Sequence, residues 1–513
     1  MTETIAGMLR RSYAGLRKTL PPNSSIHVVL KEEIRKYRLS IVLLILWGVA
    51  VALFHGLSGE GKLTLFALGM ATILWTTSKF NSAYVAIFTV IFIILSGGGE
   101  QELLFDSLSS DIVWLMIGTF ILGGALQATG LAGRLTMTLL NRAKTVQGLF
   151  WLLATVLQPL ALFIPSTSGR ASVTVPVFRS LAGYIEDCKV VKAMALLMPT
   201  VILLSTVSTL IGAGSHLIAV DLLKQFSGEG ISFIQWLVWG LPFGIVSSYV
   251  SCWVLIRMFL TKEQRLGPVK WSRSANDTAQ GGIELHSNES TSRRASQFFS
   301  FSSTEKRTLY IILAMIAGWL TESWHKLDIA MVTMLGVLLL TMPKLGVISW
   351  KEGIKHVSWN LIVFVGAALA LGQALIDSGA SNWIKDTLFA ATGSLDGSST
   401  FAALAAVVLL SLTSHIYMTS HTTRAIVMVP PLLYLASALQ LNPVAVLFIG
   451  TIGMDYCLTF PVSSKALLLF QEMDRETFAP KDLLRLSAVL IVLHVLLMVA
   501  FYYGYWQWTG LKL

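Results

Sequence analysis

The sequence has few cysteines and few charged residues for its length. Only three cysteines occur in 513 residues, Cys188, Cys252 and Cys457, and none lies close to another. This spacing indicates neither a disulfide framework nor a cysteine-ligated zinc site. Charged residues make up 13% of the chain, whereas hydrophobic residues make up 54%. Such a composition is unlike that of soluble domains and typical of proteins that cross a membrane several times.

The sequence also lacks the motifs of common enzymes. No nucleophile elbow, metal-ligand pair or nucleotide-binding loop occurs at the spacing that its chemistry requires. We therefore expect no enzyme and no cofactor, with sodium left open as a coupling ion. The net charge of +10 does not predict a nucleic-acid partner, because basic residues of membrane proteins gather in their cytoplasmic loops.

Long apolar runs recur along the chain. Several approach or reach the roughly 17 to 25 residues that a membrane-spanning helix needs: 39–57, 63–78, 83–96, 112–128 and 486–503. The basic N-terminal segment, residues 1–38, is too long for a cleaved signal sequence and is predicted to be a cytoplasmic arm. Lysine and arginine then alternate between sides, since the loop 97–111 contains neither. This pattern predicts about eleven spans in the plasma (cell inner) membrane.

Two apolar segments are interrupted by a polar tip, and they look like copies of each other. An offset of about 250 residues places Ser166 on Ser420 and Arg170 on Arg424. The first segment, 147–184, has lysines on both flanks and is predicted to be a re-entrant hairpin from the cytoplasmic side. The second, 400–439, has none on its flanks and is predicted to enter from outside.

Two further spans contain residues that weaken a helix. One break is expected around 212–216 and the other around 461–465. The predicted fold is an all-α polytopic membrane protein built as an inverted repeat of about eleven transmembrane helices, two re-entrant hairpins and two broken helices. Its predicted halves are residues 39–260 and 309–513, joined by a polar cytoplasmic linker, 261–308.

Inverted repeats with broken helices are characteristic of secondary transporters, which bind substrate near the middle of the membrane. The N-termini of half-helices favour anions, and Arg170, Arg424, His216 and Lys465 favour the same charge. A secondary transporter of anions is therefore expected. An anion channel and a membrane-embedded sensor that signals through the linker remain the alternatives.

The tips and breaks resemble those of the divalent anion:sodium symporter family, the carriers of citrate, dicarboxylates and sulfate in the ion transporter superfamily. That family carries Ser-Asn-Thr at each tip, where this chain has Ser166-Thr167-Ser168 and Ser420-His421-Thr422. The family's breaks carry Gly-Thr-Pro-Pro-like or Ala-Thr-Pro-Pro-like stretches, here replaced by residues 212–216 and 462–465. The resemblance spans nearly the whole chain, and both asparagines and the prolines are missing.

The resemblance implies that the two tips and two breaks line one site, with hydroxyl groups on the substrate and backbone carbonyls able to hold sodium near Ser166, Gly212, Ser420 and Val462. It also implies a homodimer with separate scaffold and moving domains, as in elevator-like alternating access. The candidate substrate-binding residues lie at these four segments: Ser166, Thr167, Ser168, Arg170, Gly214, Ser215, His216, Ser420, His421, Thr422, Arg424, Ser463 and Ser464.

Coupling is open between sodium symport, anion exchange and proton transport. A fixed arginine is a bidentate donor that stays charged, so Arg170 could take the place of a bound cation. Asp455 is a carboxyl group predicted within a span, which makes it the candidate proton carrier. The substrate itself is expected to be a small divalent organic or inorganic anion.

Overall fold

The computed structural model describes residues 37–78, 80–131, 143–164, 166–269, 302–392, 400–418, 420–473 and 477–513. Almost all of the predicted N-terminal arm, 1–38, and most of the predicted linker, 261–308, lie outside the described residues. Pro165 and Thr419, which belong to the first and the second predicted hairpin tip, also lie outside the described residues.

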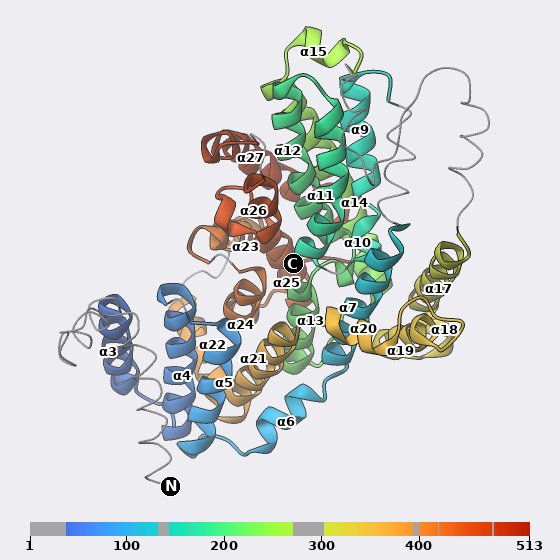
Figure 1. The fold of residues 1–513 in the computed structure, drawn as a ribbon. Coiled ribbons are helices and arrows are strands. Elements are labelled where there is room, and N and C mark those ends of the chain that lie inside the picture. Colours follow the sequence, from blue (N-terminus) through green and yellow to red (C-terminus); the bar gives the residue numbers. More distant parts are fainter. Residues whose placement is uncertain are drawn as a thin grey trace, which may run out of the picture.

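The part of the chain before the linker folds into helices that run back and forth along one direction (Figure 1). Their bounds are α3 Arg38–Leu53, α4 Gly59–Thr77, α5 Ser82–Leu95, α6 Glu102–Leu108, α7 Asp111–Thr129, α9 Val146–Leu157, α10 Leu160–Phe163, α11 Thr167–Tyr184, α12 Cys188–Leu204, the 3-10 turns η1 Ser205–Ser208 and η2 Leu210–Gly212, α13 Gly214–Ser227, α14 Phe233–Phe259 and α15 Lys262–Leu266.

The part after the linker is helical in the same way. Its elements are α17 Ser303–Leu320, α18 Glu322–His325, α19 Ile329–Thr341, α20 Trp350–His356, α21 Trp359–Asp377, α22 Ala380–Thr392, α23 Thr400–Tyr417, α24 His421–Ala438, α25 Pro443–Asp455, η4 Pro461–Ser463, α26 Lys465–Gln471, α27 Pro480–Gly504 and η5 Trp506–Thr509.

The predicted all-α polytopic fold is confirmed. Among the described residues, six helical segments are long and apolar enough to cross a membrane: Asp111–Thr129, Val146–Phe163, Cys188–Ser208, Phe233–Phe259, Trp359–Asp377 and Pro480–Gly504. Shorter apolar helices accompany them, among them Ser82–Leu95 and Ile329–Thr341. The number of about eleven spans stays a prediction.

Polar and glycine residues divide the central helices. Helix α12 ends at Leu204, and two 3-10 turns lead to Gly214, where α13 begins. In the second half α25 ends at Asp455, and a largely extended stretch with the turn η4 leads to α26 at Lys465. Both interruptions therefore expose helix ends within the interior of the molecule.

The part before the linker packs against the part after it through the helices that begin at the tips and the breaks. Helix α11 of the first half contacts α26 of the second, and α13 contacts α24. These helices occupy the middle of the molecule, whereas α3 lies at one edge and α17 and α19 at another (Figure 1). The ends of four helices from two halves are thereby brought to one central region.

Helix α14 supports the first interruption closely because it carries glycines at the contact. A Cβ atom at Gly240 would lie 2.2 Å from the carbonyl oxygen of Val207, and one at Gly244 would lie 2.1 Å from Ser208 Oγ. The buried Trp236 of the same helix donates from Nε1 to the Val207 carbonyl at 2.9 Å. Helix α14 thus holds the irregular backbone of η1 through close packing and one hydrogen bond.

Candidate functional site

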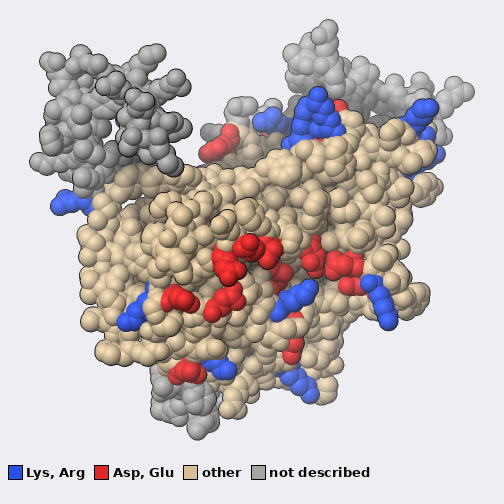
Figure 2. All heavy atoms as spheres, turned by 90° about the horizontal axis from the view of Figure 1, so that it is seen from below, with Lys and Arg blue, Asp and Glu red and all other residues tan. Residues whose placement is uncertain are grey.

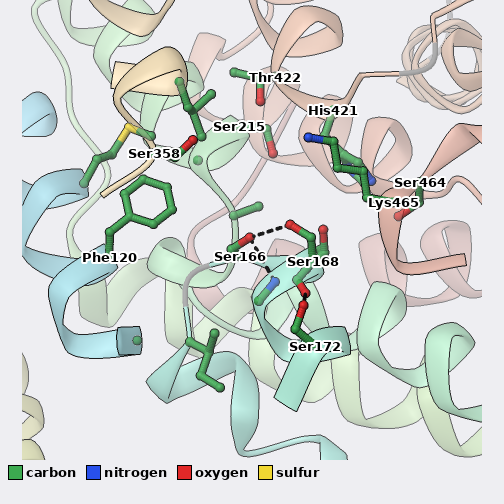
Figure 3. A pocket seen from close by; sticks show the side chains of 18 of the residues that line it. Phe120, Ser166, Ser168, Ser172, Ser215, Ser358, His421, Thr422, Ser464 and Lys465 are labelled. Atoms are coloured by element: carbon green, nitrogen blue, oxygen red, sulfur yellow. Dashed lines mark hydrogen bonds between the residues drawn. The ribbon is translucent and has the colours of Figure 1, made fainter. Parts of the chain in front are cut away.

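A cavity of about 730 Å³ lies where four helices begin. Helices α11, α13, α24 and α26 all start at its wall, and residues from their first turns line it. Figure 3 shows the side chains of Ser166 and Ser168 together on one part of this wall, Ser215 and Thr422 on another, and His421, Ser464 and Lys465 to one side of both. The free N–H groups and positive dipole ends of the helix N-termini favour a negative ligand here.

The start of α11 is held by its own hydroxyl groups. Ser166 is the N-cap, and its Oγ accepts a hydrogen bond from the backbone N–H of Gly169 at 3.2 Å. Its Oγ also lies 3.0 Å from Ser168 Oγ (Figure 3). Ser166, Thr167 and Ser168 all line the cavity. An N-capping serine satisfies one helix N–H and leaves the others available to a ligand.

The start of α24 repeats this arrangement. Ser420 is the N-cap and accepts a hydrogen bond from the backbone N–H of Thr423 at 3.3 Å. Ser420, His421 and Thr422 line the same cavity as Ser166, Thr167 and Ser168. The two tips therefore meet at one cavity although about 250 residues separate them in sequence.

Residues of the two breaks complete this wall. Gly214 and Ser215 come from the start of α13, whereas Val462, Ser463, Ser464 and Lys465 come from η4 and the start of α26. Within the described part of the chain, Ser215 Oγ and Ser463 Oγ are buried without a hydrogen-bond partner. Unpaired buried hydroxyl groups cost free energy, so these two are free to pair with a polar group that enters the cavity.

The structure keeps some of the candidate residues out of the cavity wall. Arg170, Arg424 and His216 are 0% exposed and lie behind the wall, and Gly212 and Asp455 lie there too. The remaining candidates, Ser166, Thr167, Ser168, Gly214, Ser215, Ser420, His421, Thr422, Ser463, Ser464 and the sodium candidate Val462, line the cavity.

Arg170 is bound to the interruption of its own half. Its Nη2 donates to Thr206 Oγ1 at 2.8 Å and to the carbonyl oxygen of Gly212 at 3.0 Å, and its Nη1 donates to Ser205 Oγ at 3.3 Å. The guanidinium group therefore ties the start of α11 to the break between α12 and α13. A positive charge beside the Gly212 carbonyl also disfavours a second cation at that oxygen.

Arg424 occupies the equivalent place in the second half. Its Nη1 donates to the backbone carbonyls of Met454 and Tyr456, the latter at 3.4 Å. Among the described residues, its Nε and Nη2 have no hydrogen-bond partner. Each half thus places a buried guanidinium group, four residues after the N-capping serine, against the backbone of its broken helix.

Four side chains with titratable groups lie in a row at and behind the cavity wall. His216 Nε2 lies 2.5 Å from Asp455 Oδ2, and His421 Nδ1 lies 3.7 Å from Asp455 Oδ1. His421 Nε2 in turn lies 3.0 Å from the Sγ atom of Cys457. Only His421 of this row lines the cavity. The row joins α13 of the first half to α24 and α25 of the second.

Sequence reasoning missed the wall formed by α7, α20 and α21. His356, Ser358 and Asn360 line the cavity from one side, and Gln127 and Phe120 do so from α7. The sequence feature that could have indicated this wall is the pair of apolar runs interrupted by glycine, which form α7 and α21. A Cβ atom at Gly124 would lie 2.5 Å from the His356 ring, so that glycine allows α20 to approach the cavity.

The short helix α20 is fixed at its start by a capping box between Ser349 and Glu352. Hydrogen bonds from the backbone N–H and the hydroxyl group of Ser349 lower the pKa of the exposed Glu352 below its ordinary value. This cap orients the helix that ends at His356, on the cavity wall.

A second cavity, of about 910 Å³, lies near the start of α7 and is acidic. Acidic side chains gather on the face seen in Figure 2, and those that line this cavity are Glu60, Glu100, Glu102, Asp106, Asp111, Asp221 and Asp377. Among the described residues, no group of three or more His, Cys, Asp or Glu side chains is arranged to hold a metal ion.

Comparisons with known proteins agree with this architecture. The citrate/succinate antiporter of Escherichia coli K12 is 23% identical over 404 residues, covering 75% of this chain and 77% of that protein. The sodium-dependent dicarboxylate transporter SdcS of Staphylococcus saprophyticus is 22% identical over 440 residues, covering 80% and 79%. A membrane protein of Cupriavidus necator is 25% identical over 490 residues, 89% of each chain.

Among solved structures, the YdaH transporter of Alcanivorax borkumensis is similar with a TM-score of 0.52 and 14% identity, covering 87% of this chain and 99% of that chain. A likeness this distant concerns the fold alone. The family model described as the sodium:sulfate symporter transmembrane region matches residues 32–511, nearly the whole chain. The chain therefore belongs to this family of membrane transporters.

Proposed function

We propose that this chain is a secondary active transporter that exchanges divalent anions, namely di- or tricarboxylates or sulfate. The main support is that four helices begin at one cavity, and the N-terminal end of each helix favours negative charge. The unpartnered hydroxyls of Ser215 and Ser463 supply hydrogen bonds for anion oxygens. The names of the relatives, a citrate/succinate antiporter and a dicarboxylate transporter, support carboxylates as the substrate class.

Fixed buried charge favours exchange over symport. Arg170 and Arg424 are fully buried, and the single carboxylate near them, that of Asp455, cannot offset both. A net positive charge without a counter-ion is costly to move through a low-dielectric region. A bound dianion removes this cost. The loaded carrier therefore changes sides readily and the empty carrier does not, which makes transport depend on anion on both faces.

The twin arrangement of tips and breaks supports elevator-like alternating access, in which the cavity-bearing helices move against a scaffold in a homodimer. The expected setting is the plasma membrane with the N-terminus in the cytoplasm. In that orientation the cavity residues Ser82, Gln127 and His356 lie at helix ends that face the cytoplasm.

Sodium symport is the second candidate. The family description and the name of the SdcS relative favour it. The arginines oppose sodium at the carbonyls of Gly212, Met454 and Tyr456, but the unpartnered oxygens of Ser215 and Ser463 remain. Exchange and symport predict different requirements for ions on the two faces.

Counterflow into proteoliposomes separates these functions. Vesicles loaded with unlabelled succinate, with choline replacing sodium, should accumulate labelled succinate from outside. Vesicles without internal anion should not. Uptake that needs sodium and no internal anion would support symport instead. Uptake that follows the membrane potential and shows no counterflow would support a channel, and absence of any flux over a panel of succinate, citrate and sulfate would refute a transporter of these anions.

A further inference from the structure

The contact between His216 and Asp455 joins the two halves of the molecule. His216 lies in the first turn of α13, and Asp455 is the last residue of α25. Their side chains are 0% and 6% exposed, and Nε2 and Oδ2 lie 2.5 Å apart. The other ring nitrogen, Nδ1, lies 3.1 Å from the backbone carbonyl oxygen of Thr209.

These two contacts fix the number of protons in the pair. A carbonyl oxygen only accepts hydrogen bonds, so Nδ1 of His216 must carry a proton. A neutral ring with its proton on Nδ1 has a lone pair on Nε2, which would then face a carboxylate oxygen that is also an acceptor. A contact of 2.5 Å between two acceptors is repulsive. One further proton must therefore lie between Nε2 of His216 and Oδ2 of Asp455.

Another buried histidine shows that this requirement is not general. His415 is 1% exposed, and its Nδ1 lies 2.5 Å from the carbonyl oxygen of Leu412. Its Nε2, however, lies 2.6 Å from the hydroxyl oxygen of Thr459. A hydroxyl group can donate, so the neutral ring satisfies both contacts without an added proton.

The charges around Asp455 show how a proton on this pair changes the net charge of the buried site. Arg170 of α11, His421 of α24 and His494 of α27 face its carboxylate in addition to His216 of α13. Arg424 contributes a second buried positive charge through its bonds to the carbonyls of Met454 and Tyr456, and Cys457 meets the ring of His421. With the proton in place, the His216–Asp455 pair is neutral overall and the two arginines leave a charge of about +2, which matches a dianion.

We propose that His216 and Asp455 form a proton-binding site and that the carrier binds its dianion together with this proton. Without the proton, the pair carries one negative charge and the loaded site would keep an uncompensated charge in a low-dielectric region. The proposal rests on the proposed binding of anions in the cavity. His421 lines that cavity and its Nδ1 lies 3.7 Å from Asp455 Oδ1, so a titratable ring that reaches the cavity adjoins the pair.

The test is the pH dependence of succinate binding to the purified full chain in lipid nanodiscs, measured by calorimetry between about pH 7 and 9. Carboxylic acids of ordinary pKa are fully ionised in this range, so succinate itself does not titrate. One proton bound per anion predicts that affinity falls about tenfold per pH unit once the pair titrates. It also predicts proton uptake on binding, seen as a dependence of the measured heat on the buffer.

Asp455→Asn should remove this dependence, because the amide N–H of asparagine can donate to Nε2 of His216 and no added proton is needed. Should this variant yield no binding, the double variant His216→Gln/Asp455→Asn takes its place, since neither side chain titrates and the pair stays neutral. His415→Gln is the matched control and should keep the slope of the parent. Constant affinity in the parent, or an unchanged slope in Asp455→Asn, would overturn the proton site. Absence of succinate binding at every pH would instead refute the proposed function.

Discussion

The two broken helices differ in how completely their arginines are bound. In the first half, Arg170 uses both terminal nitrogens on two hydroxyl groups and one carbonyl. In the second half, Arg424 uses only Nη1, on two carbonyls. Within the described residues, Nη2 and Nε of Arg424 have no hydrogen-bond partner, whereas Arg170 leaves only Nε.

This difference indicates that the two breaks have different roles although they occupy equivalent places in the two halves. The first break is closed around its guanidinium group, so Arg170 acts chiefly as a fixed charge that also stabilises the backbone. The second break is less complete, and it also contains Asp455 and Cys457, with His421 at the tip above it. We infer that Arg170 of the first break supplies a fixed charge, whereas Asp455 of the second break, together with His216 across the contact between the halves, responds to ligand and proton.

The largest effect is expected for Arg170→Gln. The change removes a buried charge beside Asp455 and leaves the Gly212 carbonyl without this donor. Loss of one member of a buried charged network costs about 3 to 5 kcal/mol. Thermal unfolding in detergent should show this loss, and sodium-free succinate counterflow should fall to background. Normal transport by this variant, together with steep sodium dependence in the parent, would refute the fixed-charge explanation of exchange.

A smaller loss of stability is expected for Arg424→Gln. Hydrogen bonds that involve a charged group contribute about 1.5 to 3 kcal/mol, and Arg424 makes fewer of them than Arg170. Unfolding of the two variants should be compared under one condition, and counterflow should fall in both because both remove a buried positive charge. If Arg424→Gln were destabilised as much as Arg170→Gln, the proposed difference between the breaks would be wrong.

The fold was predictable where a strong physical signal exists in the sequence. Apolar runs give membrane helices because unpaired backbone groups are costly in lipid, and the structure confirms an all-α membrane fold. The duplicated Ser-x-x-x-Arg spacing, Ser166 to Arg170 and Ser420 to Arg424, located the two helix starts that meet at the cavity. The bounds of the halves and the number of spans remain predictions.

The wall of α7, α20 and α21 could not be predicted in the same way. His356 ends the short, charged helix α20, and Ser358 and Asn360 lie at the start of α21, so only packing brings them to the cavity. Sequence also could not show that the charged ends of Arg170 and Arg424 turn away from the cavity, because a helical position fixes a side chain's origin and leaves its rotamers open. The proton between His216 and Asp455 depends on a contact across 239 positions.

Each break also contributes one hydroxyl oxygen without a partner among the described residues, Ser215 Oγ in the first and Ser463 Oγ in the second. Ser215→Ala and Ser463→Ala should each weaken succinate binding, since a hydrogen bond to a charged ligand contributes about 1.5 to 3 kcal/mol. This corresponds to roughly 10- to 150-fold in affinity. Both variants should keep the stability of the parent, because neither oxygen has a protein partner among the described residues. Unchanged affinity in both would argue against anion binding at this wall.

The smallest effect is expected at the two N-caps. Ser166 and Ser420 accept from the N–H groups of Gly169 and Thr423, at 3.2 and 3.3 Å. Replacement of an N-capping serine by alanine costs about 1 kcal/mol, so Ser166→Ala and Ser420→Ala should lower stability equally and slightly. Thr145→Ala, which removes the cap of α9 away from the cavity wall, is the control for a pure capping effect. Affinity for succinate should fall further in the two tip variants than in Thr145→Ala, because each tip serine also faces the cavity. Equal affinities in all three proteins would reduce the tip serines to helix caps and leave anion binding to the helix N–H groups and the breaks.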